Sequence, residues 1–201
     1  DTPLPKNQER TVQTWRKKGK ESELAEEFDD SVYFLTLNHD EWSWSKSIMR
    51  VKIESASKGK RPNPRTEHST SKVDTNKVII FGGWSNGGCP LNDLWALDYQ
   101  NMEFEQLDTS GIQPRPRYRH TTEVLGRKLF VLGGSDNGDD DPSKAVKNLL
   151  KGISVLDLDT LEWTHPTLTG PNPFPRSGHC STVVGKSTIA VFGGRYRPDL
   201  C

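Results

Sequence analysis

The chain has 201 residues, of which 32% are hydrophobic and 27% are charged, with 17 glycines and 13 prolines. Basic and acidic residues balance at 27 each, so a formal net charge of zero gives no electrostatic reason to expect a nucleic-acid or membrane partner. No apolar run is long enough to span a membrane, and three sparse cysteines without a CxxC pair favour a reducing, intracellular compartment, cytoplasmic or nuclear.

Residues 1–30 are rich in charge, with a basic stretch from Arg16 to Lys20 and an acidic one from Glu21 to Asp30. They lack the repeat that fills the rest of the chain. We predict that they form a charged loop insertion or a poorly ordered segment, in which residues 14–28 have the composition of a short helix.

Three segments of the remaining chain repeat one pattern, namely Pro-Arg, a histidine, a polar and then apolar stretch, and Gly-Gly. They are residues 64–83, 116–134 and 175–194. The apolar run before Gly-Gly is continuous, which predicts a strand buried on both faces. Gly-Gly then ends the strand, because glycine permits positive φ and a close approach of the backbone.

A second element also occurs three times, as an apolar strand, a turn, and a glutamate followed by an aromatic residue. It occupies residues 35–42, 97–104 and 156–163. Together the two elements predict a four-stranded unit: strand a holds the histidine, strand b precedes Gly-Gly, strand c precedes the turn, and strand d begins at Glu-aromatic. The aromatic residue of strand d is expected to pack between neighbouring units.

The repeat predicts that residues 31–201 form an all-β region of half-units and complete units. The expected boundaries are a half-unit at 31–54 with strands c and d, units at 64–110 and 116–170, and a half-unit at 175–201 with strands a and b. Residues 135–149 are predicted to be an insertion between strands b and c of the second complete unit.

These features resemble the kelch repeat, in the divergent branch that includes host cell factor-like proteins and kelch proteins linked to ubiquitin ligases. The resemblance implies a kelch β-propeller, here a partial ring with about three blades' worth of four-stranded antiparallel sheets. The residues to which it gives a structural role are Gly82, Gly83, Gly133, Gly134, Gly193, Gly194, Trp42, Phe104 and Trp163.

A ring that stops in the middle of a blade leaves strand edges unpaired. Three explanations stay open: the chain is one part of a longer protein that supplies the other blades, two copies complete one ring as a homodimer, or the two half-blades pair within one chain.

Catalytic and metal-binding patterns were sought and none supports a site, so we predict a protein that is not an enzyme, with no cofactor and no metal. The recurring residues His68, His120 and His179 would lie on different blades, so each is expected to fix its own blade by a hydrogen bond. Cys180 directly follows His179 in a strand, so their side chains should point to opposite faces.

In kelch domains the partner docks on the loops that follow Gly-Gly and on those that precede Pro-Arg. Exposed aromatic residues and arginines in these loops are the best candidates for contact. The predicted partner-binding residues are Trp84, Asn86, Tyr118, Arg119, Arg195, Tyr196 and Arg197. The arginines of Pro-Arg itself, Arg65, Arg117 and Arg176, occur in every copy and are expected to hold adjacent blades together.

Two function classes remain. The first is a non-catalytic scaffold that presents these loops to a protein or peptide partner, as a substrate receptor or an organiser of complexes. The alternative is the regulatory propeller of a larger enzyme, such as a kelch-containing phosphatase.

Overall fold

The computed structural model describes residues 32–38, 41–47, 50–51, 61–136, 149–171, 173 and 175–196. All regular elements among these residues are β-strands, so the predicted all-β fold is confirmed. This part of the chain contains no helix with the length and apolar character needed to cross a membrane. The predictions for residues 1–30 and for Arg197, and most of the predicted insertion, lie outside the described residues.

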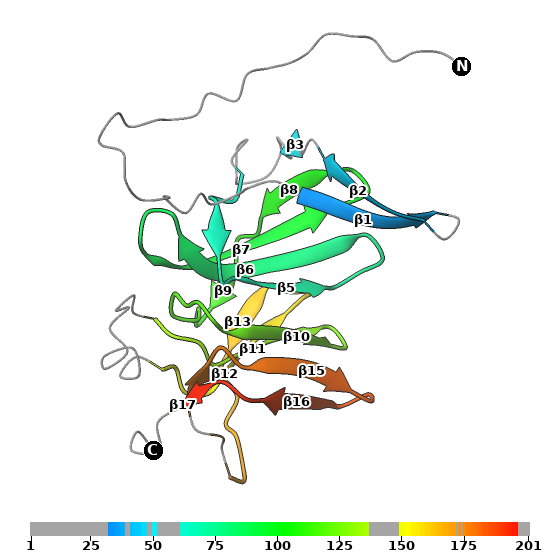
Figure 1. The fold of residues 1–201 in the computed structure, drawn as a ribbon. Coiled ribbons are helices and arrows are strands. Elements are labelled where there is room, and N and C mark those ends of the chain that lie inside the picture. The colour runs from blue at the N-terminus through cyan, green and yellow to red at the C-terminus, as the bar shows by residue number, and fades with distance from the viewer. Residues whose placement is uncertain are drawn as a thin grey trace, which may run out of the picture.

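Two four-stranded antiparallel blades form the centre of the structure (Figure 1), and in each the strand order follows the chain. The first blade contains β5 (Ser69–Lys72), β6 (Lys77–Ser85), β7 (Pro90–Asp98) and β8 (Glu103–Gln106). The second blade contains β10 (Thr121–Leu125), β11 (Lys128–Leu132), β12 (Ile153–Asp157) and β13 (Glu162–Thr164). These elements are the strands predicted as a to d of the two complete units.

A two-stranded hairpin lies at each end of the row of blades. The first hairpin contains β1 (Val32–Asn38) and β2 (Glu41–Ser47), and the last hairpin contains β15 (Cys180–Val184) and β16 (Thr188–Phe192). Strand β10 packs between β5 and β15, so the first strands of successive blades lie side by side. The order along the row is therefore hairpin, blade, blade, hairpin.

The repeat does not predict five further strands of two residues each. They are β3 (Arg50–Val51), β4 (Arg65–Thr66), β9 (Ser110–Gly111), β14 (Arg176–Ser177) and β17 (Arg195–Tyr196). Strand β9 runs parallel to β13, and β3 runs parallel to β8 in the same way. The chain that leaves the fourth strand of one blade thus covers the free edge of the next blade, an edge that would otherwise be open to other chains.

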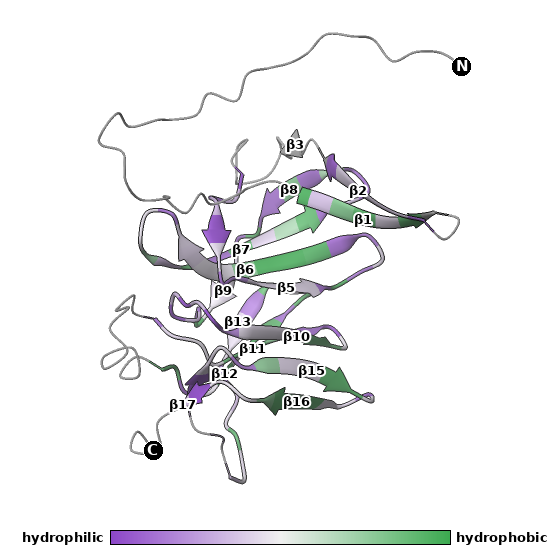
Figure 2. Cartoon of the chain, in the orientation of Figure 1, coloured by the Kyte–Doolittle hydropathy of each residue, from purple (hydrophilic) through white to green (hydrophobic). Residues whose placement is uncertain are grey.

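The largest core cluster lies between the two complete blades. Its members, each at most 3% exposed, are Ile79, Phe81, Leu94 and Ala96 from the first blade and Leu129, Val131, Leu156 and Trp163 from the second. Strand b is apolar on successive residues because one face packs on the preceding blade and the other on the following blade. Figure 2 shows this continuous hydrophobic character along β6.

The aromatic residues of strand d lie at the joints between neighbouring elements. The ring of Trp163 is 5.5 Å from that of Phe81 across the joint between the two blades, measured between centroids. Phe104 packs with Trp95 and Leu97 in a second cluster, against which Val32 of the first hairpin also packs.

The first hairpin departs from the predicted arrangement of its aromatic residue. Trp42 was assigned the position of Trp163, yet its side chain is 65% exposed. A blade that precedes the hairpin would be needed to cover it, and the described residues contain none. The expected packing of Trp42 between blades is therefore not seen in this part of the chain.

The register of the hairpin explains a further difference. Trp44 lies opposite Leu35, as Trp163 lies opposite Leu156, whereas Trp42 lies opposite Leu37 and closer to the turn. The turn of the first hairpin is shorter than the turns between strands c and d in the blades. Trp44 therefore takes the position opposite the leucine that Trp163 has in the second blade, although the repeat pattern in the sequence had selected Trp42.

Candidate functional site: the Gly-Gly face

The loops that follow Gly-Gly lie on the same edge of the molecule as the Pro-Arg segments, because the two are paired. Arg65 lies opposite Ser85, and Arg176 lies opposite Tyr196. Tyr118 forms the equivalent bridge with Ser135 in the second blade. This edge, called the Gly-Gly face below, carries the predicted partner-binding residues that the structure describes.

The first glycine of the first two pairs lies directly against the next blade. A Cβ on Gly82 would lie 2.8 Å from the carbonyl oxygen of Arg117, and one on Gly133 would lie 2.4 Å from that of Arg176. Gly193 has a similar φ of +74°, but a Cβ there would meet nothing within 4 Å. No following blade is present among the described residues, so the joint between blades is what excludes a side chain at this position.

The arginines of Pro-Arg were predicted to hold adjacent blades together, and they do so by their main chain, whereas their side chains bind inside their own blade. The Nη1 atoms of Arg65, Arg117 and Arg176 donate to the carbonyl oxygen of the first glycine in the same repeat, at 3.0, 2.9 and 3.0 Å. The main chain of the arginine crosses the joint. Its carbonyl oxygen accepts from the second glycine of the preceding blade, as in the bond of 2.9 Å from Gly83 to Arg117.

The buried Arg65 has a carboxylate partner that no repeated spacing reveals. Its two terminal nitrogens donate to the oxygens of Asp93 at 2.6 and 2.8 Å, and Trp95 Nε1 donates to the same carboxylate at 2.6 Å. The side chain of Arg65 is only 5% exposed, so the carboxylate of Asp93 balances a positive charge that water hardly reaches. Burial lowers the pKa of the equivalent Arg117 to about 10, and the nearby charge of Asp136 opposes that shift.

The repeat histidines join adjacent blades, which corrects the prediction that each fixes its own blade. His120 Nε2 lies 2.7 Å from Ser69 Oγ, and His179 Nε2 lies 2.9 Å from Thr121 Oγ1. Each hydroxyl belongs to the residue that follows the histidine of the preceding blade. Burial is the main cause that lowers the pKa of His120 to about 3, and it also lowers the pKa of His179. Both imidazoles are therefore neutral at physiological pH.

One position on the Gly-Gly face differs in chemistry from blade to blade and has a left-handed backbone in every copy. It is occupied by Glu67, Arg119 and Gly178, with φ of 55°, 55° and 65°. The Arg119 amide donates to the Glu67 carbonyl at 3.1 Å, and the Gly178 amide donates to the Arg119 carbonyl at 2.8 Å. The main chain thus carries a row of bonds across the blades that does not depend on which side chains are present.

Trp84, Tyr118 and Arg119 form a cluster across the joint between the two blades. The rings of Trp84 and Tyr118 meet edge to face with centroids 5.1 Å apart, and the Arg119 guanidinium lies 5.4 Å from the Tyr118 centroid. Arg119 Nε also donates to Glu67 Oε1 at 2.6 Å. Tyr118 is only 5% exposed, so its predicted role as a surface contact is not supported. The ring is covered because its backbone is bridged into the blade and Trp84 packs on it.

The other predicted residues lie nearer to solvent. The Arg119 side chain is 39% exposed, and Trp84 is partly exposed. Asn86 and Arg195 are exposed, and so is Tyr196, whose ring lies 5.9 Å from the Arg176 guanidinium. The surface of the Gly-Gly face is therefore composed of cationic, amide and aromatic groups, which suits the recognition of carboxylates and apolar side chains.

The part of the chain that the structure describes contains no candidate metal site. No three side chains of histidine, cysteine, aspartate or glutamate gather there closely enough to hold an ion. The buried histidines are used for bonds between blades, as described above.

Comparison with known proteins gives the family. The model of the KLHDC2/KLHL20/DRC7 Kelch-repeats domain matches residues 19–199. Host cell factor 2 of Homo sapiens is 35% identical over 86% of this chain and 24% of its own length. Acyl-CoA-binding domain-containing protein 4 of Arabidopsis thaliana is 33% identical over 68% of the chain and 19% of its own length.

A third relative, the Rho GTPase-activating protein gacHH of Dictyostelium discoideum, is 33% identical over 74% of the chain and 9% of its own length. The chain thus spans less than a quarter of the length of each of these relatives. The family match covers both complete blades and both hairpins, so the chain belongs to the kelch-repeat family and forms part of a β-propeller.

Proposed function

We propose that this chain is a non-catalytic scaffold that binds a protein or peptide partner on its Gly-Gly face. One observation carries the proposal. The recurring residues, namely the arginines of Pro-Arg, the histidines and the glycines, are used for bonds within and between blades. The residues that differ between blades, such as Trp84, Arg119 and Arg195, lie partly or fully at the surface of one face.

The proposed partner is a peptide segment that carries acidic groups, such as acidic side chains or a C-terminal carboxylate. Arg119 already holds the carboxylate of Glu67 by its Nε atom. An incoming carboxylate can use the outer nitrogens of the same guanidinium, while Trp84 and Tyr196 offer apolar area beside it. A substrate receptor or an organiser of complexes needs such a surface.

A cytoplasmic or nuclear location belongs to the same proposal. Cys89 and Cys180 are free and exposed, which suits a reducing compartment. We also propose that more blades complete the ring, either from a second copy or from the remainder of a longer chain. A regulatory propeller within a larger enzyme is the second candidate, because the relative from Dictyostelium is named as a GTPase-activating protein and is much longer than this chain.

Pull-down from cell extract with matched variants tests the proposed face. We expect the proteins retained by the wild-type chain to be lost with Trp84→Ala and with Arg119→Ala. The control is Arg127→Ala, because Arg127 and Asp159 form an exposed ion pair just before β11 and just after β12, at the ends of these strands away from the Gly-Gly face. If both variants retain the same proteins while circular dichroism shows a native fold, the Gly-Gly face is not the binding site.

A further inference from the structure

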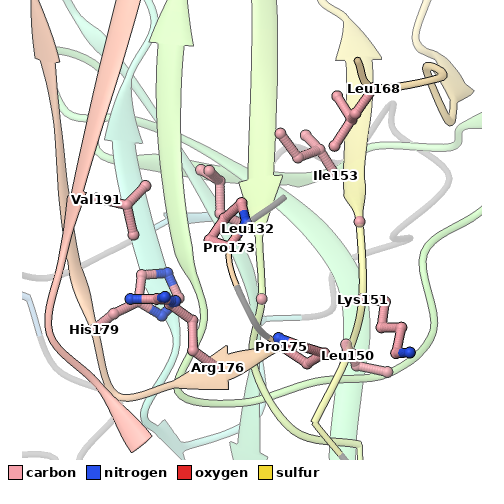
Figure 3. A pocket seen from close by; sticks show the side chains of 12 residues that line it. Leu132, Leu150, Lys151, Ile153, Leu168, Pro173, Pro175, Arg176, His179 and Val191 are labelled. Atoms are coloured by element: carbon pink, nitrogen blue, oxygen red, sulfur yellow. The ribbon is translucent and has the colours of Figure 1, made fainter. Parts of the chain in front are cut away.

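A pocket of about 330 Å³ opens between the second blade and the last hairpin (Figure 3). Its apolar lining includes Leu132 at the end of β11, Ile153 at the start of β12 and Val191 on β16, with Pro173 and His179 beside them. It is called the end pocket below. Its position between two successive sheets makes it comparable with the joint between the first and second blades.

Repeat-equivalent residues line both places. Leu132 corresponds to Phe81 and Ile153 to Leu94, since the register of strands b and c is the same in the two blades. In the joint between the blades, this space is occupied by Leu156 and Trp163 of the following blade. The last hairpin supplies strands a and b, and no strand c or d follows it among the described residues. The end pocket is therefore a joint that lacks its leucine and its tryptophan.

A glycine after the fourth strand of the second blade also lacks a contact. A Cβ on Gly111 would lie 2.3 Å from the carbonyl oxygen of Trp163, because β9 pairs with the fourth strand of the next blade. The repeat equivalent, Gly170, has a similar φ of +83°, but a Cβ there would meet nothing within 4 Å. The backbone of Gly170 therefore has the conformation used for a neighbour, and no described residue takes that place.

The first hairpin carries the leucine and tryptophan that the end pocket lacks. Leu35 and Trp44 are cross-strand partners, as Leu156 and Trp163 are. On the same face lie Tyr33, Leu37 and Trp42, and the five side chains are 47–70% exposed. The opposite face of the hairpin includes Val32, which packs on the first blade. The apolar face therefore has no partner among the described residues.

The two ends of one chain do not meet, since the first and last hairpins lie at opposite ends of the row of blades (Figure 1). Figure 2 shows hydrophobic residues on β1 at one end and on β15 and β16 at the other. Both β16 and β1 pair with only one of the described strands, so each has a free edge.

We propose that the first hairpin of a second copy of this chain docks on the last hairpin, with Leu35 and Trp44 filling the end pocket. The register of β11 and β12 places the partner's β1 beside β16, with Leu35 opposite Ile189 and Thr36 opposite Thr188. Each copy presents this hairpin and this pocket among its described residues, so two copies can make the joint twice with two-fold symmetry. Main-chain bonds along the strands set the register, and the apolar pair fills the pocket. None of the predicted partner-binding residues lines the end pocket, so this inference stands apart from the proposed partner site.

Sedimentation of the full chain at micromolar concentration is the first test. We expect a dimer for the wild type and a monomer for the double variant Trp42→Ser, Trp44→Ser. The control is Ile112→Ser, because Ile112 is 69% exposed but belongs to neither the hairpin nor the pocket. A wild-type monomer, or a dimer that survives the double variant, overturns the proposal.

A glycine variant tests the pocket side without removing apolar surface. Gly170→Ala has room in a single chain but places a methyl group where the partner's β2 must approach. We expect it to raise the dissociation constant of the dimer at least tenfold while leaving the circular dichroism spectrum unchanged. The matched control, Gly126→Ala, has a positive φ of +61° and open space in a turn. Equal dimer strength in the two variants contradicts the proposed joint.

Disulfide cross-linking between two differently marked chains checks the register. With the native cysteines changed to serine, one chain carries Thr36→Cys and the other Thr188→Cys. We expect a mixed disulfide in mild oxidant, and none when Thr182→Cys on β15 replaces Thr188→Cys. Cross-linking of equal yield at both positions, or at neither, overturns the proposed pairing of β1 with β16.

Discussion

The imidazole Nε2 of His120 lies 2.7 Å from the hydroxyl oxygen of Ser69, and this bond joins the second blade to the first. The same contact recurs between His179 and Thr121 at the next joint. A neutral imidazole suits such a buried position because protonation would place a charge where water cannot reach it. The contact between neighbouring blades therefore depends on the protonation state of His120 and His179.

The stability of the protein should fall as the pH is lowered. The pKa of His120 is lowered to about 3 by burial, whereas the unfolded chain titrates near the ordinary value of 6.5. Below that value the unfolded state binds more protons, so His120 lowers the free energy of unfolding by about 1.4 kcal/mol per pH unit until its folded pKa is reached. Urea unfolding at neutral pH and at about pH 5 measures the effect.

The variant His120→Gln isolates the contribution of this residue from that of the carboxylates. It cannot titrate, so its deficit relative to the wild type should shrink as the pH falls from neutral to about 5. A deficit that is the same at both pH values would show that His120 is not the titrating group.

The joint at Gly82 should tolerate no side chain. We expect Gly82→Ala to lower the free energy of unfolding by about 2–4 kcal/mol, from a strained backbone and a collision with the Arg117 carbonyl. Gly126→Ala has the same kind of backbone but open space, so it should lose only about 1 kcal/mol. Chemical denaturation compares the two, and equal losses would mean that the neighbouring blade exerts no constraint.

Removal of the Asp93 carboxylate should lower the free energy of unfolding far more than removal of the Glu67 carboxylate. Asp93→Ala leaves the buried Arg65 guanidinium without its counter-charge and Trp95 Nε1 without an acceptor, so we expect a loss of about 3 kcal/mol. Glu67→Ala removes the partly exposed pair with Arg119 and should lose less than about 1 kcal/mol. Thermal denaturation ranks them, and a smaller effect at Asp93 would contradict the assigned role.

The aromatic of strand d should hold the two complete blades together. Trp163 is 2% exposed between them, so Trp163→Ala should lower the free energy of unfolding by about 3–5 kcal/mol. Ile112→Ala, at a site that is 69% exposed, should change it by less than about 0.5 kcal/mol. Urea unfolding of both variants decides the point; similar midpoints would remove Trp163 from the core of the joint.

The strands were predictable from the sequence because each unit repeats a strong local pattern. Continuous apolar runs before Gly-Gly locate strand b, and Glu-aromatic locates strand d. The short parallel strands were not predictable, since the pairing of Gly111 with Trp163 depends on the next blade and leaves no local periodicity. The selection of Trp42 over Trp44 failed for a similar reason: a shorter turn shifted the pairing while the glutamate kept its place in the sequence.

The candidate site was predicted only in outline. Loop position locates the Gly-Gly face, but it does not show which aromatic residue is covered. Tyr118 follows Pro-Arg in what reads as an exposed turn, whereas in the structure Trp84 from the preceding blade packs on its ring. The sequence did not show that the histidines bond to the preceding blade, because a bond within a blade and a bond to the neighbouring blade require the same residue types.

The main-chain row through Glu67, Arg119 and Gly178 has a consequence for how such a surface changes over generations. The bonds of this row use amides and carbonyls, and the left-handed backbone already accepts glutamate, arginine and glycine. Mutations at these positions can therefore exchange one side chain for another at little risk to folding. Selection can retarget the face one blade at a time, while the frame that spaces the three positions stays the same.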